Sequence, residues 1–393
     1  MRTLIVCHDP AFPPMSGADL RNYRNAGLAA EYGPVRLVSV RPQSKPSKPL
    51  DSRIQTVALT IDGEPRTASI GWWRVAGENR ISRSALTRLE VLVSRFRPDT
   101  IVVEGIPLFK LLRPLRPLAS QLILDMHNVE SDLAGQLQQN ARWGLSAMTA
   151  AFGLRRLERK SLSIVDRVWV CSGQDREKLN ALAGHRVRID VVPNGIPRAE
   201  DIPTALPAQA TTANGFPVIL FIGHLGYEPN IDAAVRLAGA ILPRIRKALP
   251  DARLTIAGRS PAPKVQALAE QPGVTLVENP AEMAPLLMSA HLTIIPLSSG
   301  GGTRIKLLEA MAWGVPVIAT PLAAEGLDLI DREEVLLSAS DEDLANAAIA
   351  LCRDRGRLAK QRIRAHEAVW ARFGPEAIRD ALRHGLGLDD ADG

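Results

Sequence analysis

The chain has 393 residues, of which 46% are hydrophobic and 23% charged, a balance typical of a soluble globular protein. This length predicts two domains, and the aromatic share of only 4% disfavours a protein that binds nucleic acid by base stacking. The net charge of +6 is unevenly distributed, because residues 1–200 carry 29 Lys and Arg against 19 Asp and Glu. The basic first half indicates an anionic partner such as phosphate groups, a membrane surface or nucleic acid, although solvated helix faces account for most of these charges.

The cysteines and the apolar segments indicate a cytoplasmic protein. Cys7, Cys171 and Cys352 are odd in number and far apart, so they predict neither a disulfide framework nor a metal site. No apolar run approaches the roughly 20 residues that span a bilayer. The first apolar run is too short for a signal peptide and predicts a strand.

Strands and helices alternate through residues 1–196. The apolar runs predict strands at 4–6, 35–40, 54–59, 100–103, 122–124, 167–170 and 189–192, and the amphipathic segments predict helices at 19–30, 81–96, 143–163 and 174–183. This alternation specifies a doubly wound α/β domain. The loop after the first strand lies where the ligand crevice of such sheets forms.

A Pro-, Ala- and Thr-rich stretch at 197–215 predicts a linker to a second alternating set. Strands are expected at 218–222, 253–257, 274–276, 292–296, 315–319 and 335–337, and helices at 230–249, 263–270, 283–290, 303–313, 341–352 and 354–371. The second α/β domain therefore spans residues 216–369. Two such domains imply a cleft between them, the usual place for a ligand.

The most informative stretch is GGGTRIKLLEAMAWG at 300–314. Its first three residues let the backbone turn sharply and approach a ligand; they are Gly300, Gly301 and Gly302. Thr303 is suited to cap the helix that follows, and Gly314 ends it. A strand, a glycine turn and a helix N-terminus together form an anion site. A tight turn whose glycines serve only packing is the alternative.

Two charged residues of that helix favour the ligand site. Lys306 and Glu309 lie one turn apart on the same face. A cation beside an anion site suits phosphate groups, and a carboxylate one turn deeper can accept hydrogen bonds from ribose hydroxyls. The pattern therefore predicts a site for a nucleotide diphosphate.

Several further motifs occur in a fixed order along nearly the whole chain. They are PPMSG at 13–17 with Arg21, DMHNVE at 125–130, VPNG at 192–195, FIGHLGYEPN at 221–230, AGR at 257–259, and the glycine-rich stretch. With these motifs the chain resembles the GT-B glycosyltransferases. Within them it is similar to the retaining family 4, or group 1, enzymes that build cell-surface polysaccharides and glycolipids.

The resemblance implies a nucleotide-sugar donor held mainly by the second domain and an acceptor held by the first. A terminal helix at 370–388 should pack back on the first domain. Glu309 corresponds to the ribose-binding glutamate, the second acid of the family's E-x7-E motif. Gly301 stands where the first acid is expected, so the motif does not predict the identity of the donor sugar.

The remaining site residues are also implied by the resemblance. The donor-binding set is Ser16, Gly17, Gly223, Arg259, Gly300, Gly301, Gly302, Thr303 and Glu309. The region 223–228 lacks the family's basic pair, so Arg304 and Lys306 are the cations expected to offset charge on the departing diphosphate. His127 is expected beside the donor sugar. Asp9 and Glu104 either contact the acceptor or serve as structural caps. The scheme needs no metal and no cofactor.

The expected protein is a retaining transferase that moves a hexose from a nucleotide sugar to a hydroxyl of a glycan or glycolipid precursor. Trp72-Trp73 and the basic residues at 155–160 indicate peripheral contact with anionic lipid on the inner face of the cytoplasmic membrane. No nucleic-acid partner is expected. Two alternatives stay open: a UDP-sugar 2-epimerase of the same fold, and a non-catalytic nucleotide-sugar-binding protein.

Overall fold

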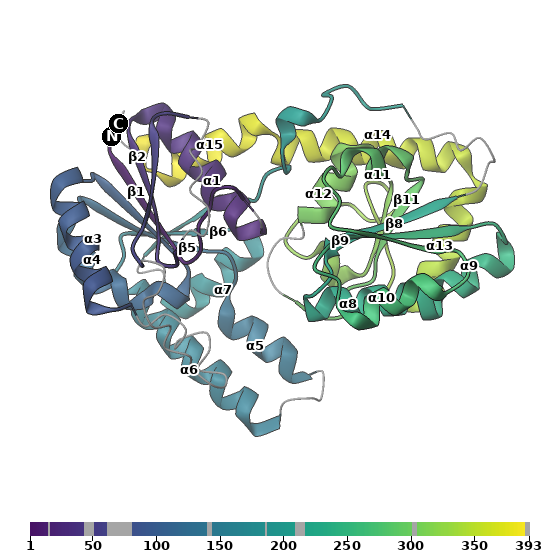
Figure 1. The fold of residues 1–393 in the computed structure, drawn as a ribbon, viewed down its shortest axis with the longest axis horizontal. Helices are drawn as coiled ribbons and strands as arrows, with labels where there is room; N and C mark the ends of the chain where they lie inside the picture. Colours follow the sequence, from purple (N-terminus) through teal and green to yellow (C-terminus); the bar gives the residue numbers. More distant parts are fainter. Residues whose placement is uncertain are drawn as a thin grey trace. The chain divides into compact units, whose positions relative to one another are not determined.

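The computed structural model describes residues 1–14, 16–42, 51–60, 81–139, 144–184, 187–208, 217–300 and 305–389. The chain forms two compact units, one made of Met1–Asn194 with Ile378–Gly393 and the other of Gly195–Ala377. In each unit helices cover both faces of a parallel sheet (Figure 1). This confirms the prediction of two doubly wound α/β domains.

The first unit contains a seven-stranded sheet in the order β3-β2-β1-β4-β5-β6-β7. Its strands are β1 Thr3–Cys7, β2 Val35–Ser39, β3 Ile54–Ala58, β4 Thr100–Glu104, β5 Gln121–Met126, β6 Arg167–Val170 and β7 Arg188–Val191. All pairs are parallel, and β1 lies between β2 and β4. The strand order therefore reverses between β1 and β4, which is where ligands bind in open sheets of this type.

The four helices predicted for the first unit are present, together with others that were not predicted. They are α1 Gly17–Ala29, η1 Ala30–Tyr32, α3 Arg83–Phe96, η2 Ile106–Leu111, α4 Leu112–Leu115, η3 Arg116–Leu118, α5 Glu130–Gln139, α6 Gly144–Leu162 and α7 Gly173–Ala183. Helix α5, which packs along α6 (Figure 1), was not predicted. Buried Glu158 of α6 holds its start, because it accepts hydrogen bonds from Ser131 N at 3.0 Å and Ser131 Oγ at 2.6 Å.

The second unit repeats the same strand order, with β10-β9-β8-β11-β12-β13. Its strands are β8 Val218–His224, β9 Arg253–Arg259, β10 Val274–Glu278, β11 Leu292–Ile295, β12 Val317–Ala319 and β13 Leu336–Leu337. The order reverses between β8 and β11. The sequence-predicted glycine-rich stretch follows β11, so it leaves the sheet at this switch point.

The helices of the second unit include two 3-10 helices that were not predicted, η4 and η7, and one predicted helix that is divided. They are η4 Ala199–Asp201, α8 Glu228–Arg236, η5 Leu237–Ile241, α9 Leu242–Ala248, α10 Pro263–Gln266, η6 Ala267–Glu270, α11 Ala284–Ser289, α12 Ile305–Ala312, η7 Pro321–Ala324, α13 Asp341–Arg353 and α14 Arg355–Phe373. The single helix expected at 230–249 is divided by the π-turn η5. Pro243 lacks an N–H and its ring crowds the preceding turn, so the helix widens there.

The helix expected at 370–388 begins later than predicted. Residues 370–373 complete α14, and α15 spans Pro375–Gly385. The break falls at Gly374, where a Cβ would lie 2.3 Å from Trp370 O. Pro375 also disfavours a helical conformation for the residue before it.

The end of α15 packs into the first unit. Leu382 and Leu386 belong to the same buried cluster as Trp169 of β6. The Trp169 indole Nε1 donates a hydrogen bond to Gly385 O at 2.9 Å. A buried indole N–H needs such a partner, so this bond fixes where the helix ends.

Two sequence predictions about the whole chain can be compared with the structure. All three cysteines are free, with Cys7 and Cys171 buried. None of the helices within the described ranges is long and apolar enough to cross a membrane. Trp72 and Trp73, in contrast, lie outside the described residues.

Candidate functional site

The first predicted donor residues follow β1. Ser16 is the N-cap of α1, and its hydroxyl accepts a hydrogen bond from Asp19 N at 3.1 Å. Gly17 is the exposed first residue of that helix. Ser16 is therefore used by its own helix in this structure, and the donor contact predicted for both residues stays a prediction.

His127 directly follows β5 and lies between two carboxylates. Its Nδ1 is 3.7 Å from Glu104 Oε1, and its Nε2 is 3.5 Å from Asp125 Oδ2. Glu104 and Asp125 are register partners on the adjacent strands β4 and β5. The Nε2 atom is buried and has no hydrogen-bond partner within the described part of the chain. The ring is thus placed beside the first unit's switch point by two acidic neighbours.

Asp125 is itself held by a buried ion pair with Arg21. Arg21 Nη2 is 2.6 Å from Asp125 Oδ1, and both side chains are at most 2% exposed. Burial alone would raise the pKa of Asp125, but the charges of Arg21 and His127 hold that pKa well below its ordinary range. Arg21 Nη1 also donates to Val192 O at 2.6 Å. One guanidinium therefore connects α1, the His127 loop and the end of β7.

Glu104 serves as a cap on the loop that follows β1. Its Oε2 accepts a hydrogen bond from His8 N at 2.8 Å. Burial raises the pKa of Glu104, and the nearby His127 opposes that shift. Asp9 forms an ion pair with Arg41 at 3.1 Å. Both acids thus have structural partners, and contact with an acceptor stays a prediction for each.

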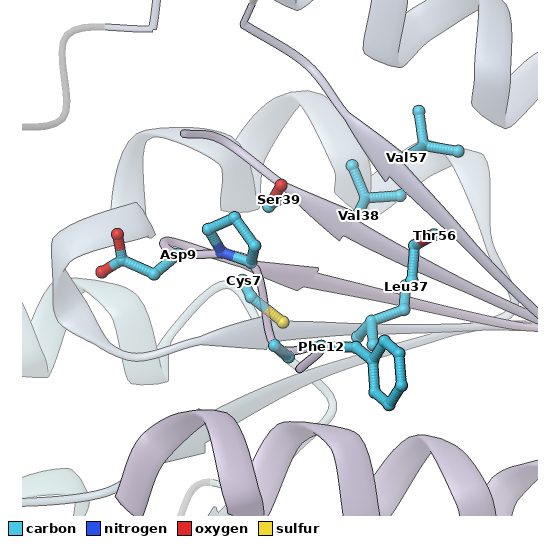
Figure 2. A pocket seen from close by; sticks show the side chains of 10 residues that line it. Cys7, Asp9, Phe12, Leu37, Val38, Ser39, Thr56 and Val57 are labelled. Atoms are coloured by element: carbon cyan, nitrogen blue, oxygen red, sulfur yellow. The ribbon is translucent and has the colours of Figure 1, made fainter. Parts of the chain in front are cut away.

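A small cavity lies at the carboxyl ends of β1, β2 and β3 (Figure 2). Cys7, Asp9, Phe12 and Ser39 line it together with apolar side chains of β2 and β3. Its volume is about 10 Å³. A cavity of that size holds about one water molecule, so it is too small for a hexose.

In the second unit, Gly223 and Arg259 lie at adjacent strand ends. Gly223 of β8 pairs with Gly258 of β9, and His224 pairs with Arg259. A Cβ at Gly258 would lie only 1.8 Å from Gly223 O, so glycine is required for this close approach. Burial lowers the pKa of His224, and the Arg259 charge adds to that effect. The structure therefore brings these two predicted donor residues together.

The glycine-rich stretch is described only at its two ends. Gly300 is buried and has φ +123°, a left-handed backbone that glycine adopts without strain. Four predicted site residues lie outside the described residues: the donor-binding Gly301, Gly302 and Thr303, and the cation Arg304. Lys306 lies at the start of α12, where its Nζ is 2.6 Å from Asn230 Oδ1 and 4.7 Å from the centre of the Phe221 ring.

Glu309 lies one turn further along α12. Burial raises the pKa of its carboxyl to about 7, while the charge of Arg198 acts in the opposite direction. Within the ranges that the structure covers, this partly buried carboxyl group has no hydrogen bond and no ion pair. Unpartnered carboxylates are unfavourable in such surroundings, so hydroxyl donors from a ligand would be stabilising here.

Three side chains of the site belong to the sequence motifs, but their structural roles were not predicted. Arg21 and Asp125 form the buried pair, and Asn230 contacts Lys306. Their partners are 104 and 76 positions away in the sequence. No local pattern signals such pairings.

Two doubly wound units, each with functional candidates at the carboxyl ends of its strands, define a protein of the GT-B class. Two family models match the chain: a glycosyl transferase 4-like domain over residues 22–195, and glycosyl transferases group 1 over residues 216–354. The chain belongs to the group 1 glycosyltransferases, family 4.

Individual relatives and solved structures agree with this family. The phosphatidyl-myo-inositol mannosyltransferase of Mycobacterium tuberculosis is 29% identical over 246 residues, which cover 60% of this chain. The match spans about three-fifths of that relative, or 61% of its length. The fold is similar to that of sucrose-phosphate synthase from Thermosynechococcus elongatus, with a TM-score of 0.76, 17% identity and full coverage of both chains. It is also similar to Anabaena HepE in complex with UDP, with a TM-score of 0.66, 12% identity, and coverage of 99% of this chain and 100% of that one.

Proposed function

We propose that the protein is a retaining hexosyltransferase. It moves a hexose from a nucleotide sugar to a hydroxyl of a glycan or glycolipid precursor of the cell surface. The observation that carries the proposal is the pair on α12: the Lys306 ammonium at the end of β8, and one turn away the Glu309 carboxyl group, which has no hydrogen bond or ion pair with the residues that the structure describes. This spacing of a cation and an acceptor of hydrogen bonds suits a diphosphate and its ribose.

The proposed reaction breaks the bond between the anomeric carbon and the diphosphate oxygen. The acceptor hydroxyl oxygen forms the new bond to that carbon, and its proton leaves with the diphosphate or solvent. Lys306 and Arg304 stabilise the charge that develops on the diphosphate, an electrostatic effect that is usually large in catalysis. His127 hydrogen-bonds the donor sugar. The scheme uses no metal ion and no cofactor.

The relatives support the two substrate classes of the proposal. The Mycobacterium tuberculosis relative is by name a mannosyltransferase that acts on phosphatidyl-myo-inositol. The Anabaena protein of similar fold is in complex with UDP. A nucleotide-linked donor and a lipid-linked acceptor are therefore the first substrates to examine.

We expect one or a few nucleotide sugars to raise the melting temperature of the protein in a panel of UDP-, GDP- and ADP-sugars. A ligand present at 100 times its dissociation constant stabilises the folded state by about 2.7 kcal/mol.

Transfer or donor hydrolysis should then be lost in Glu309→Ala and His127→Ala, and EDTA should leave wild-type activity unchanged. Glu333→Ala is the matched control, because that carboxylate is 52% exposed and far from α12 in the sequence.

The outcomes separate the alternatives. If no nucleotide stabilises the protein, the proposal fails. Donor binding without transfer or hydrolysis would indicate a non-catalytic binding protein. Isomerisation of the donor sugar without any acceptor would indicate the epimerase.

We further infer that α6 contacts anionic membrane surfaces. Its exposed side chains include Arg155, Arg156, Arg159 and Lys160, and Phe152 on the same helix is 72% exposed. Each basic residue near such a surface contributes about 1 kcal/mol, and salt screens that attraction. The apolar ring can enter the interface beside them.

Arg155→Ser/Arg156→Ser should weaken flotation with phosphatidylserine vesicles at low salt by at least tenfold, since two charges of about 1 kcal/mol each are removed. Arg244→Ser/Lys247→Ser removes two exposed charges from α9 and serves as the control. Equal losses in both variants, or no wild-type binding at low salt, would contradict a specific membrane face on α6.

A further inference from the structure

The ammonium group of Lys306 is held in place from three sides. Its Nζ donates to Asn230 Oδ1 at 2.6 Å and lies 4.7 Å from the centre of the Phe221 ring. A Cβ added to Gly223 would lie 3.0 Å from that same Nζ. A lysine side chain has up to about 2 kcal/mol of rotamer entropy to lose on ordering. These contacts have already ordered it before any ligand binds.

Asn230 can hold this position because its own amide is fixed. The side chain is 7% exposed and lies in the first turn of α8. Its Nδ2 donates to His224 O at 3.0 Å, and a carbonyl can only accept. The remaining amide oxygen must therefore face the ammonium group, which can only donate.

The choice of an amide also preserves the charge of the lysine. A carboxylate at position 230 would form an ion pair with Lys306 and cancel the local positive charge. An amide oxygen accepts a hydrogen bond from the ammonium group without neutralising its charge. No Lys or Arg occurs between Gly223 and Glu228, so positive charge at the end of β8 comes from other elements, among them Lys306 of α12 and Arg259 of β9.

We propose that Asn230 is a positioning residue for the donor diphosphate. It acts through Lys306, which it holds at the switch point between β8 and β11, and it does not itself touch the donor. This inference rests on the proposed function, since it assigns Lys306 to the diphosphate. It predicts that Asn230 affects phosphate recognition and leaves recognition of the nucleoside unchanged.

The test compares the affinities for a nucleoside, its monophosphate and its diphosphate, for the base that stabilises the wild type best. Asn230→Asp and Asn230→Ala should each weaken diphosphate binding about tenfold, the value of one hydrogen bond to a charged group, with nucleoside binding unchanged. Lys306→Met should weaken it at least as much. Adding Asn230→Ala to Lys306→Met should cause no further loss, because the two residues act as one unit.

A purely structural role would give a different pattern. Equal losses for nucleoside and diphosphate, or additive losses in the double variant, would overturn the inference. Gly223→Ala places a methyl group 3.0 Å from both Lys306 Nζ and Asn230 Nδ2, so it should reproduce the selective loss even if Asn230→Ala does not fold. A wild type that binds no nucleotide refutes the proposed function instead, while diphosphate binding that is weakened in Lys306→Met but unchanged in both Asn230 variants refutes only this inference.

Discussion

Asp125→Ala is expected to lower the free energy of unfolding by about 3–5 kcal/mol at neutral pH. The substitution leaves the Arg21 guanidinium, whose side chain is 1% exposed, buried without its carboxylate. An uncompensated buried charge is far more costly than the loss of the pair itself. Urea unfolding followed by circular dichroism measures the change. The double variant Arg21→Met/Asp125→Leu should recover part of the loss, because it removes both charges.

The exposed ion pair between Arg379 and Glu31 provides the control. These side chains are 43% and 36% exposed, so Glu31→Ala should cost less than about 1 kcal/mol. The pH dependence provides a second check. Arg21 and His127 lower the pKa of Asp125 in the folded state, so its stabilisation is complete above the unfolded value of about 3.9 and is lost as pH falls below it. Equal costs for Asp125→Ala and Glu31→Ala would refute the buried pair.

The central strands could be predicted from the sequence because they are nearly continuous apolar runs. In parallel sheets covered by helices on both faces, such runs are buried on both sides. Both β1 and β11 are entirely buried, as this argument requires. The prediction of helices was less accurate. The break at Gly374 depends on Pro375, which follows it. The start of α5 depends on a hydrogen bond from Ser131 to Glu158, which lies 27 positions later.

The site could be predicted only where its residues are close together in the sequence. Lys306 and Glu309 share a face of one helix, so their spacing alone indicated a common ligand. A buried arginine has no local signature, and for this reason the role of Arg21 was missed. Its partner Asp125 lies on β5, 104 positions later in the sequence. The two residues become neighbours only when that strand has joined the sheet. Long-range pairing of this kind is decided by topology and not by local pattern.

The two sheets have the same strand order but different chemistry at their switch points. In the first unit, Glu104 and Asp125 surround a histidine. In the second unit, a lysine is held at the end of β8 and the acid Glu309 has no partner among the residues that the structure describes. In the first arrangement both acids have protein partners, whereas the buried His127 Nε2 has no hydrogen-bond partner among the described residues. In the second, Lys306 and Glu309 lie one turn apart on α12, and the proposed function assigns the donor diphosphate and its ribose to them.

Glu309→Gln is expected to stabilise the free protein while weakening donor binding. The pKa of this carboxyl is raised to about 7 in the folded state, above the ordinary value of 4.5. Between these values the folded state binds more protons than the unfolded state, so stability falls as pH rises and the full cost is present above about pH 7. Because the side chain is partly exposed, we expect the substitution to gain about 2 kcal/mol at pH 8 and almost nothing at pH 4. Thermal unfolding at both pH values measures this difference.

The affinity for the donor should change in the opposite direction to the stability of the free protein. Ribose hydroxyls donate to an ionised carboxylate more strongly than to a neutral amide, so Glu309→Gln should weaken donor binding about 10- to 100-fold at pH 8. Wild-type affinity should rise between pH 6 and pH 8 as Glu309 loses its proton, and the variant should lack that rise. The exposed Glu333→Gln should change neither quantity. If Glu309→Gln instead destabilises the free protein at pH 8, the carboxylate already has a partner without ligand, and the assignment of the ribose to it loses its basis.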